Sequence, residues 1–235
     1  MGISRRDFFY GTAASTALVL STSGAKAHAC VMPTQDRQAA LTPQGVVDEL
    51  MAGNERFVSG DMIHCDLNAQ VAQTAQGQYP IAAVVGCIDS RVPPELVFDQ
   101  NIGDIFSARV AGNFVNTDIL GSLEFACRVA GSKAIVVLGH TSCGAVKGAI
   151  DQVELGNLTA MLQRIEPAVE AAGPTDMRSS SNTEFVQRVA DANVSLTVAA
   201  ILEQSEVLAG MVEAGELVIV GAMHDVATGR VSLIG

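Results

Sequence analysis

The sequence predicts an α/β fold with a mostly parallel central sheet and helices on both of its faces. Short apolar runs rich in valine, isoleucine and alanine alternate with longer stretches of helical periodicity, which is typical of a covered parallel sheet. Two of the runs, 81–86 and 134–139, are apolar throughout, as expected for strands that are buried on both faces. The chain has 235 residues, 49% of them hydrophobic and 17% charged, which is enough material for one full core.

The first 29 residues have the composition of a targeting segment. Residues 4–9 read Ser-Arg-Arg-Asp-Phe-Phe and resemble a twin-arginine export motif, and a mildly apolar stretch and the small-residue pattern Ala27-His28-Ala29 follow. We therefore expect 1–29 to be a cleaved signal peptide and 30–235 to be one domain. The product would be periplasmic or otherwise exported by the twin-arginine machinery. A basic N-terminus that stays attached is the alternative.

The segment before the first strand predicts one long helix and one short connector. Apolar residues over 42–58 have helical spacing, and Thr42 followed by Pro43 suits an N-cap and a first turn. The stretch 70–78 is polar and short, which indicates a connector or a frayed helix.

Strands and helices alternate through the middle of the chain. Between the two buried runs, a short helix is expected to begin at Pro93-Pro94, and a strand is expected over 105–110. A helix over 118–130 follows, and Gly131 is placed to end it, because glycine readily adopts the left-handed conformation after a helix. The next helix is predicted over 144–153.

The last third of the chain predicts helices and then two strands. We expect one helix at the start of 154–182, a serine-rich polar break at its end, and helical periodicity again over 183–208. Strands at 216–222 and 231–234 surround the turn Thr228-Gly229. The sheet is expected to include one antiparallel edge strand.

Charge and hydropathy argue against several classes of partner. The formal charge of −11 disfavours nucleic acid and anionic membranes. No apolar run after residue 30 approaches the roughly 20 residues that a membrane span needs, so no membrane span is expected.

Three of the five cysteines stand apart from any motif. They are Cys30, Cys65 and Cys127, and an odd number of leftover cysteines is a poor disulfide framework. Cys127 lies in a predicted helix and is expected to pack in the core. The dipeptide His64-Cys65 has too few neighbouring ligands to predict a second metal site.

Two short segments carry the candidate metal ligands. Cys87 and Asp89 come directly after the first buried strand, and His140 and Cys143 come after the second. Ligands in open α/β sheets gather beyond the carboxyl ends of the strands, so these groups should meet at one edge of the sheet. Two thiolates, an imidazole and a carboxylate suit Zn²⁺ better than other common ions. We therefore expect a catalytic zinc site, with a closed structural zinc site as the alternative.

The chain resembles the β-class carbonic anhydrases over roughly 46–234. Four motifs in the order and spacing of that family carry the resemblance: Cys87-x-Asp89-Ser90-Arg91, Arg109-Val110-Ala111-Gly112-Asn113, Gly139-His140-x-x-Cys143-Gly144 and Gly221-Ala222-x-x-Asp225. The resemblance implies the β-carbonic anhydrase fold and reversible hydration of CO₂ to bicarbonate and a proton.

The resemblance also assigns roles at the metal site. Cys87, His140 and Cys143 would hold one Zn²⁺ per chain, and Asp89 with Arg91 would form a catalytic pair beside it. Zinc lowers the pKa of a bound water to about 7, which supplies the hydroxide that attacks CO₂. Two thiolates oppose this shift because they cancel the charge of the ion, so a polar surrounding shell is needed.

The substrate pocket is implied in the same way. Gln78 matches a bicarbonate-binding amide of the plant-like subgroup, and Phe106 and Phe125 match aromatic residues that line its apolar slot. That subgroup usually has Tyr where this chain has Phe125. The backbone N–H of Gly144 could meet a substrate oxygen. The role of His224, at a position where the family often has Tyr, is left open.

Two forms of the site occur in this family. In the closed form the aspartate, here Asp89, is the fourth zinc ligand, and bicarbonate is held in a regulatory pocket that uses a Trp. This chain has no Trp and keeps Gln78, which favours the open form with Asp89 paired to Arg91. The resemblance further implies at least a dimer, in which Gln78 and Phe106 face the zinc of the partner; dimer and tetramer stay open.

Two other functions remain as alternatives. Related enzymes of this fold hydrolyse CS₂ or COS, which are linear like CO₂, and the pocket residues do not separate these substrates. A non-enzymatic zinc or thiol-redox protein is the second alternative, because Cys87 and Cys143 could oxidise in an exporting compartment.

Overall fold

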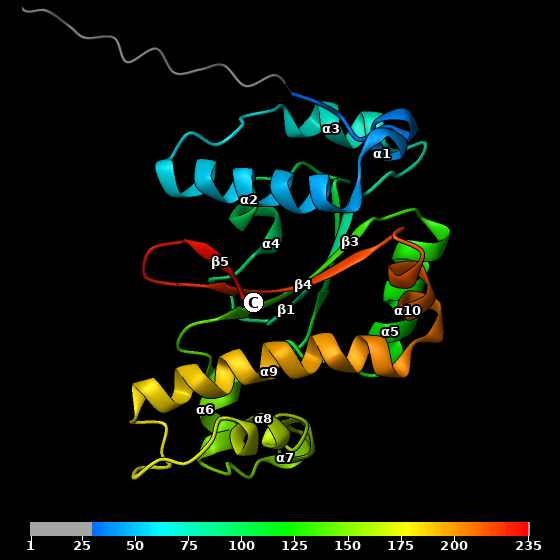
Figure 1. Ribbon diagram of the computed structural model, residues 1–235. Helices are drawn as coiled ribbons and strands as arrows, with labels where there is room; N and C mark the ends of the chain where they lie inside the picture. The colour runs from blue at the N-terminus through cyan, green and yellow to red at the C-terminus, as the bar shows by residue number, and fades with distance from the viewer. Residues whose placement is uncertain (1–29, 235) are drawn as a thin grey trace, which may run out of the picture.

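A five-stranded sheet in the order β2-β1-β3-β4-β5 forms the centre of the molecule (Figure 1). The computed structural model describes residues 30–234, so the predicted signal peptide lies outside the described residues. The strands are β1 (Ala82–Gly86), β2 (Ile105–Arg109), β3 (Ala134–His140), β4 (Val218–His224) and β5 (Val231–Ile234). β1 to β4 pair in parallel and β5 pairs antiparallel with β4, which confirms the predicted α/β fold and its antiparallel edge strand.

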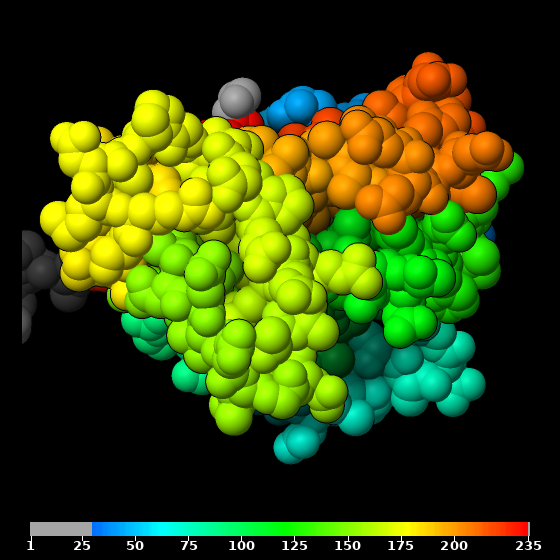
Figure 2. Space-filling model, turned by 90° about the horizontal axis from the view of Figure 1, so that it is seen from below, coloured from blue at the N-terminus to red at the C-terminus, as the bar shows by residue number. Residues whose placement is uncertain are grey.

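Helices cover both faces of this sheet. On one side lie α1 (Gln35–Ala40), α2 (Pro43–Ser59), α3 (Leu67–Thr74) and α4 (Pro94–Val97). On the other lie α5 (Thr117–Glu124), α6 (Gly144–Ile150), α7 (Gly156–Leu162), α8 (Glu166–Ala171), α9 (Thr183–Gln204) and α10 (Glu206–Glu213). Seen from below, α9 and α10 in orange, α5 in green and the yellow-green α7–α8 region cover this second face (Figure 2).

The strands feed two separate cores because successive side chains point to opposite faces. In β3, Val136 and Leu138 join the core under α2, whereas Ile135 and Val137 join the core under α9. All seven residues of β3 are buried, as the continuous apolar run predicts. This central strand therefore holds its last residue, His140, at a fixed place on the carboxyl edge of the sheet.

Three predicted helices are divided differently in the structure. The helix expected over 118–130 is α5 followed by a π-helical turn, Phe125–Val129, and Gly131 ends it with a φ of +84°. The helix expected after residue 154 is two helices, because Pro167 lacks the N–H that a continuous helix needs. The periodicity over 183–208 breaks at Ser205, whose hydroxyl caps α10 by accepting from the Leu208 N–H.

The helix α9 is long and apolar enough to cross a membrane, by length and composition alone. The sequence interpretation did not anticipate this run. In the fold, Val189, Val194 and Ile201 are completely buried in the core between α9 and the sheet. The packing of these side chains in the core accounts for the apolar character of α9.

The contact between α2 and α4 depends on the absence of a side chain at Gly53. A Cβ there would lie 1.8 Å from the carbonyl oxygen of Phe98, and backbone cannot move aside as a flexible side chain can. We expect Gly53→Ala to lower the free energy of unfolding by about 3 kcal/mol, measured by chemical denaturation. Gly210→Ala is the control, because a Cβ at this exposed position in α10 meets nothing within 4 Å and should stabilise slightly. Equal midpoints for the two variants would contradict the prediction.

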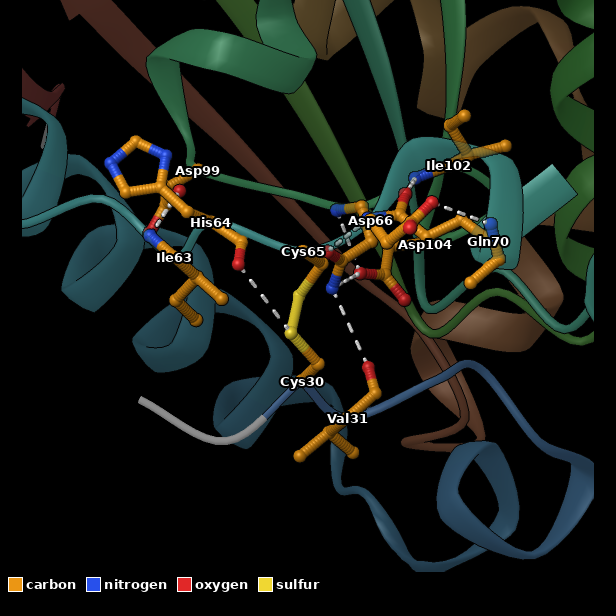
Figure 3. Close-up of a disulfide and its surroundings, with 12 residues drawn as sticks. Cys30, Val31, Ile63, His64, Cys65, Asp66, Gln70, Asp99, Ile102 and Asp104 are labelled. Atoms are coloured by element: carbon orange, nitrogen blue, oxygen red, sulfur yellow. Dashed lines mark hydrogen bonds between the residues drawn. A yellow bond between two sulfur atoms is a disulfide. The ribbon is translucent and has the colours of Figure 1, made fainter. Parts of the chain in front are cut away.

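Cys30 and Cys65 form a disulfide, 35 residues apart in the sequence (Figure 3). The expectation that the leftover cysteines make no disulfide framework was therefore wrong. The odd number of leftover cysteines was misleading, because Cys127 is buried without a partner and only Cys30 and Cys65 remain to form a pair. Burial raises the pKa of the Cys127 thiol to about 12 and makes it an inert core residue.

The disulfide fastens an N-terminal arm, residues 30–41, to the body of the protein. The Asn101 amide donates to the Val31 carbonyl at 3.4 Å. Further along the arm, the buried Gln38 amide donates to the carbonyls of Pro80 and Ala130, both at 2.8 Å. The arm is thus an integral part of the fold from Cys30 onward.

Candidate metal centre

Cys87, His140 and Cys143 meet at the carboxyl edge of the sheet. Their ligand atoms all lie within 4.8 Å of one another, and all three residues are buried. Cys87 directly follows β1, His140 is the last residue of β3, and Cys143 is the N-cap of α6. Because β1 and β3 are neighbouring parallel strands, their ends bring the two sequence motifs together.

The side chain of His140 is oriented as a metal ligand. Its Nδ1 lies 3.0 Å from the carbonyl oxygen of Thr141, so Nδ1 carries the proton and donates it. Nε2 then has a free lone pair, and this buried atom has no hydrogen-bond partner among the described residues. A completely buried, unpartnered imidazole nitrogen beside two thiols is costly unless a cation binds it, so the residues fit a zinc ion.

The two thiols shift each other's pKa. The neighbouring Cys143 thiol lowers the pKa of Cys87 to about 4, and the same interaction together with burial raises the pKa of Cys143. The Gly112 N–H also donates to Cys87 Sγ at 3.3 Å. The cluster thus holds a thiolate at neutral pH, and a divalent ion would replace the remaining proton. Two sulfurs and one nitrogen are a donor set of catalytic zinc.

Asp89 and Arg91 form a two-pronged ion pair at the rim of this cluster. Arg91 Nε donates to Asp89 Oδ1 at 2.9 Å, and Arg91 Nη2 donates to Oδ2 at 2.7 Å. This pairing is the main reason that the pKa of Asp89 lies well below its usual range. Asp89 Oδ2 lies 3.8 Å from His140 Nε2, so an ionised carboxylate faces the metal-binding atoms.

Arg109 braces the first metal loop, a role that the sequence analysis did not assign. Its Nε donates to the Cys87 carbonyl at 2.9 Å, and its Nη2 donates to the Asp89 carbonyl at 2.7 Å. Arg109 ends β2 and pairs in register with Gly86 of β1. The position of this arginine at a strand end, within a recognised motif, could have indicated this role.

The second metal loop is braced from β4. The Thr141 N–H donates to the His224 carbonyl at 2.9 Å, and the Thr141 hydroxyl lies 3.4 Å from Asp225 Oδ1. The Val226 N–H donates to this hydroxyl at 3.1 Å. The motif that ends in Asp225 therefore fixes the backbone beside His140.

His224 lies next to His140 in the register of β3 and β4. It is buried, and neither of its ring nitrogens has a hydrogen-bond partner among the described residues. Burial lowers the pKa of His224, so the imidazole is neutral. A neutral ring at this place adds no positive charge beside the metal-binding atoms.

The predicted substrate residues lie in three separate places. Gly144 is exposed at the start of α6, directly beside Cys143 and the cluster. Phe106 and Phe125 pack edge to face with their ring centroids 6.2 Å apart, and both line an open pocket of about 610 Å³ along β2 and α5. Gln78 is exposed before the amino end of β1, whereas Cys87 follows its carboxyl end. Within one chain, Gln78 therefore does not meet the cluster.

Comparison with known proteins agrees with this geometry. Residues 82–231 match the sequence model of the carbonic anhydrase family. Carbonic anhydrase 2 of Mycobacterium tuberculosis is 39% identical over 190 residues, which cover 78% of this chain and 89% of that protein. The carbonic anhydrase of Mycolicibacterium smegmatis is 37% identical over the same shares.

Solved structures of β-carbonic anhydrases have the same fold. One from Aspergillus fumigatus superposes with a TM-score of 0.62 at 28% identity, covering 71% of this chain and 81% of that one. Tetrameric enzymes from Sordaria macrospora give a TM-score of 0.63 at 25% identity over 81% of this chain and 94% of theirs. Because sequence, fold and the cysteine–histidine cluster agree, this chain belongs to the β-class carbonic anhydrase family and is a carbonic anhydrase.

Proposed function

We propose that this chain is an exported zinc enzyme that interconverts CO₂ with bicarbonate and a proton. The observation that carries the proposal is the buried Cys87–His140–Cys143 cluster with the ionised Asp89 at its rim. When bound, zinc supplies a Lewis acid that lowers the pKa of water to about 7. Cys87, His140 and Cys143 would hold it, and the Thr141 carbonyl keeps the His140 ring in the ligating tautomer.

Asp89 orients the reacting solvent. Arg91 keeps this carboxylate ionised, so the carboxylate can only accept a hydrogen bond. A neighbouring solvent oxygen that donates to Asp89 therefore directs its lone pair away from Asp89. A CO₂ molecule in that direction is met by a lone pair instead of a hydrogen. Gly144 lies beside the cluster, where its backbone N–H can donate to a substrate oxygen.

We propose the open form of the site at neutral pH. Both carboxylate oxygens of Asp89 accept hydrogen bonds from Arg91, which favours a carboxylate held beside the metal instead of bound to it. A structure of the zinc-loaded enzyme at neutral pH tests this. An Asp89 oxygen within about 2.0–2.2 Å of zinc would overturn it.

The activity is tested by stopped-flow CO₂ hydration with parallel metal analysis. We expect one zinc per chain, loss of the hydration rate after chelation, and recovery on adding Zn²⁺. A rate that is independent of metal, or a purified protein that binds none, would contradict the proposal. Sulfide release from CS₂ and COS in the same preparation tests the alternative substrates, which would be favoured if it exceeded CO₂ hydration.

We propose that two copies of the chain complete each site. β1 rises about 3.3 Å per residue, so its five residues alone keep Gln78 more than about 13 Å from the cluster of its own chain. The pocket that Phe106 and Phe125 line lies along β2, an open edge of the sheet. A second copy on this edge would bring Gln78 and Phe106 to the partner's metal.

Mixing two inactive variants tests this arrangement. Gln78→Ala removes the amide and keeps the metal-binding cluster. Cys143→Ser removes a metal ligand and keeps the amide of Gln78. If the sites are shared, a mixture refolded together regains CO₂ hydration, because a mixed dimer has one intact site. Light scattering gives the oligomeric state, and a fully active monomer would overturn the proposal.

The Cys30–Cys65 disulfide supports export. Disulfides persist in oxidising compartments, and Cys30 is the first residue after the predicted cleavage site. Exported protein should therefore begin at Cys30 when its N-terminus is sequenced. Finding the uncleaved chain in the cytosol would contradict export.

Reduction of the disulfide is expected to destabilise the fold. The bond closes a loop with a sequence separation of 35, and a crosslink of this kind contributes about 2–4 kcal/mol. We expect Cys65→Ser and Cys30→Ser to lower the free energy of unfolding by the same amount, measured by denaturation without reductant. Adding reductant should bring the unmodified protein to the same value and leave the variants unchanged. An unmodified protein that is insensitive to reductant would contradict this prediction.

A further inference from the structure

A buried asparagine lies in the apolar face of α9. Asn193 is 3% exposed and lies between Val189, one turn before it, and Thr197, one turn after it, both of them buried. A buried amide costs free energy unless it is hydrogen-bonded, so its partners indicate its purpose. Asn193 Nδ2 donates to the Gly112 carbonyl at 2.8 Å, 81 residues away in the sequence.

The same Gly112 contacts the metal-binding cluster. Its N–H donates to Cys87 Sγ at 3.3 Å. Gly112 has a φ of +88°, which favours glycine, and a Cβ there would lie 2.5 Å from Ile165 Cδ1. Asn113 follows with a φ of +43°, a conformation that is uncommon outside glycine. Two successive left-handed residues need an outside contact to keep them in place, and Asn193 supplies it.

We propose that Asn193 is a positioning residue for the metal centre. Within the described residues it makes no hydrogen bond to a ligand. It holds the carbonyl of the peptide that follows Gly112, and so fixes the backbone that directs the N–H of the preceding peptide at Cys87. This hydrogen bond draws negative charge away from the sulfur. A site with two thiolates needs this, because strong sulfur donation weakens the Lewis acidity of the ion. The inference rests on the zinc site proposed above and adds to that site a supporting residue from α9.

Asn193→Leu tests the proposal, because leucine has a similar volume and no donor. We expect the dissociation constant for Zn²⁺, measured by competition with a chromophoric chelator, to rise about 10- to 100-fold, because the loop would no longer hold the Cys87 sulfur in the position for binding. In the Co²⁺-substituted protein, the sulfur-to-cobalt charge-transfer band should move to lower energy, because the sulfur becomes more electron-rich. The kcat for CO₂ hydration should fall more than KM changes.

Thr197→Val is the matched control. Thr197 lies one turn further along the same face of α9, is 4% exposed, and donates no hydrogen bond to the loop of Gly112 within the described residues. Its variant should keep the Zn²⁺ affinity and the charge-transfer band of the unmodified protein. If Asn193→Leu does not fold, Asn193→Ala carries the same expectation, because it introduces no new contact.

The outcomes separate this inference from the zinc proposal. An unmodified protein that binds no metal overturns the proposed site itself. If the unmodified protein binds zinc, an unchanged affinity and an unchanged band in the Asn193 variants overturn only the positioning role. Equal changes in Thr197→Val would also overturn it, because they would reflect general loosening of α9.

Discussion

Replacing Cys143 by serine is expected to remove zinc and with it CO₂ hydration. A serine hydroxyl stays protonated at neutral pH and is a poor ligand, so the rate should fall far more than the roughly 100-fold typical of losing a group around the ligands. The fold should survive, because Cys143 is the N-cap of α6 and serine is among the best N-cap residues. Metal analysis, circular dichroism and stopped-flow hydration measure the three effects.

Cys127→Ser is the control for this variant. Cys127 is also buried and unpaired, but it lies in the π-helical turn after α5 and takes no part in the cluster. Its serine variant should lose some stability and keep both zinc and activity. If Cys143→Ser kept a full complement of zinc and the normal rate, the ligand set would be wrong.

Asp89→Asn is expected to lower kcat/KM for CO₂ hydration by about 100-fold or more, without loss of zinc. The amide has the shape of the carboxylate but no charge, and its NH₂ group would donate to solvent where Asp89 accepts. Arg91 would lose its ion-pair partner at the same time. The measurement is steady-state hydration together with metal content.

Asp151→Asn controls for the removal of a hydrogen-bonded carboxylate elsewhere. Asp151 lies at the far end of α6 and accepts hydrogen bonds from the backbone and hydroxyl of Ser180. Its variant should retain full activity. Equal zinc content with undiminished activity in Asp89→Asn would remove Asp89 from the mechanism and would favour a protein that only binds metal.

Local patterns in the sequence predicted the strands and the positions of the metal ligands, because these depend on residues that are neighbours in the chain. The buried runs became β1 and β3, and the strand–loop order brought Cys87, His140 and Cys143 to one edge. Parallel strands leave little choice in where their carboxyl ends meet. Ligands that directly follow two such strands are therefore predictable without knowledge of the packing.

The contacts that the sequence did not predict join residues far apart in the chain. Asn193 and Gly112 are 81 residues apart, and the amide in α9 resembles any polar residue in a helix until the loop is seen beneath it. The disulfide between Cys30 and Cys65 was missed because the number of cysteines does not show which cysteine is buried in the core without a partner. The helix breaks at Pro167 and Ser205 were marked by residues with a known local effect.

If the protein is exported as proposed, the bond between Cys30 and Cys65 would also protect its new amino terminus. The twin-arginine route would carry a chain that has already folded in the reducing cytosol, so both thiols would still be free when the fold forms. Oxidation after export would then close residues 30–65 into a ring that begins at the new amino terminus. An aminopeptidase would meet no loose segment there.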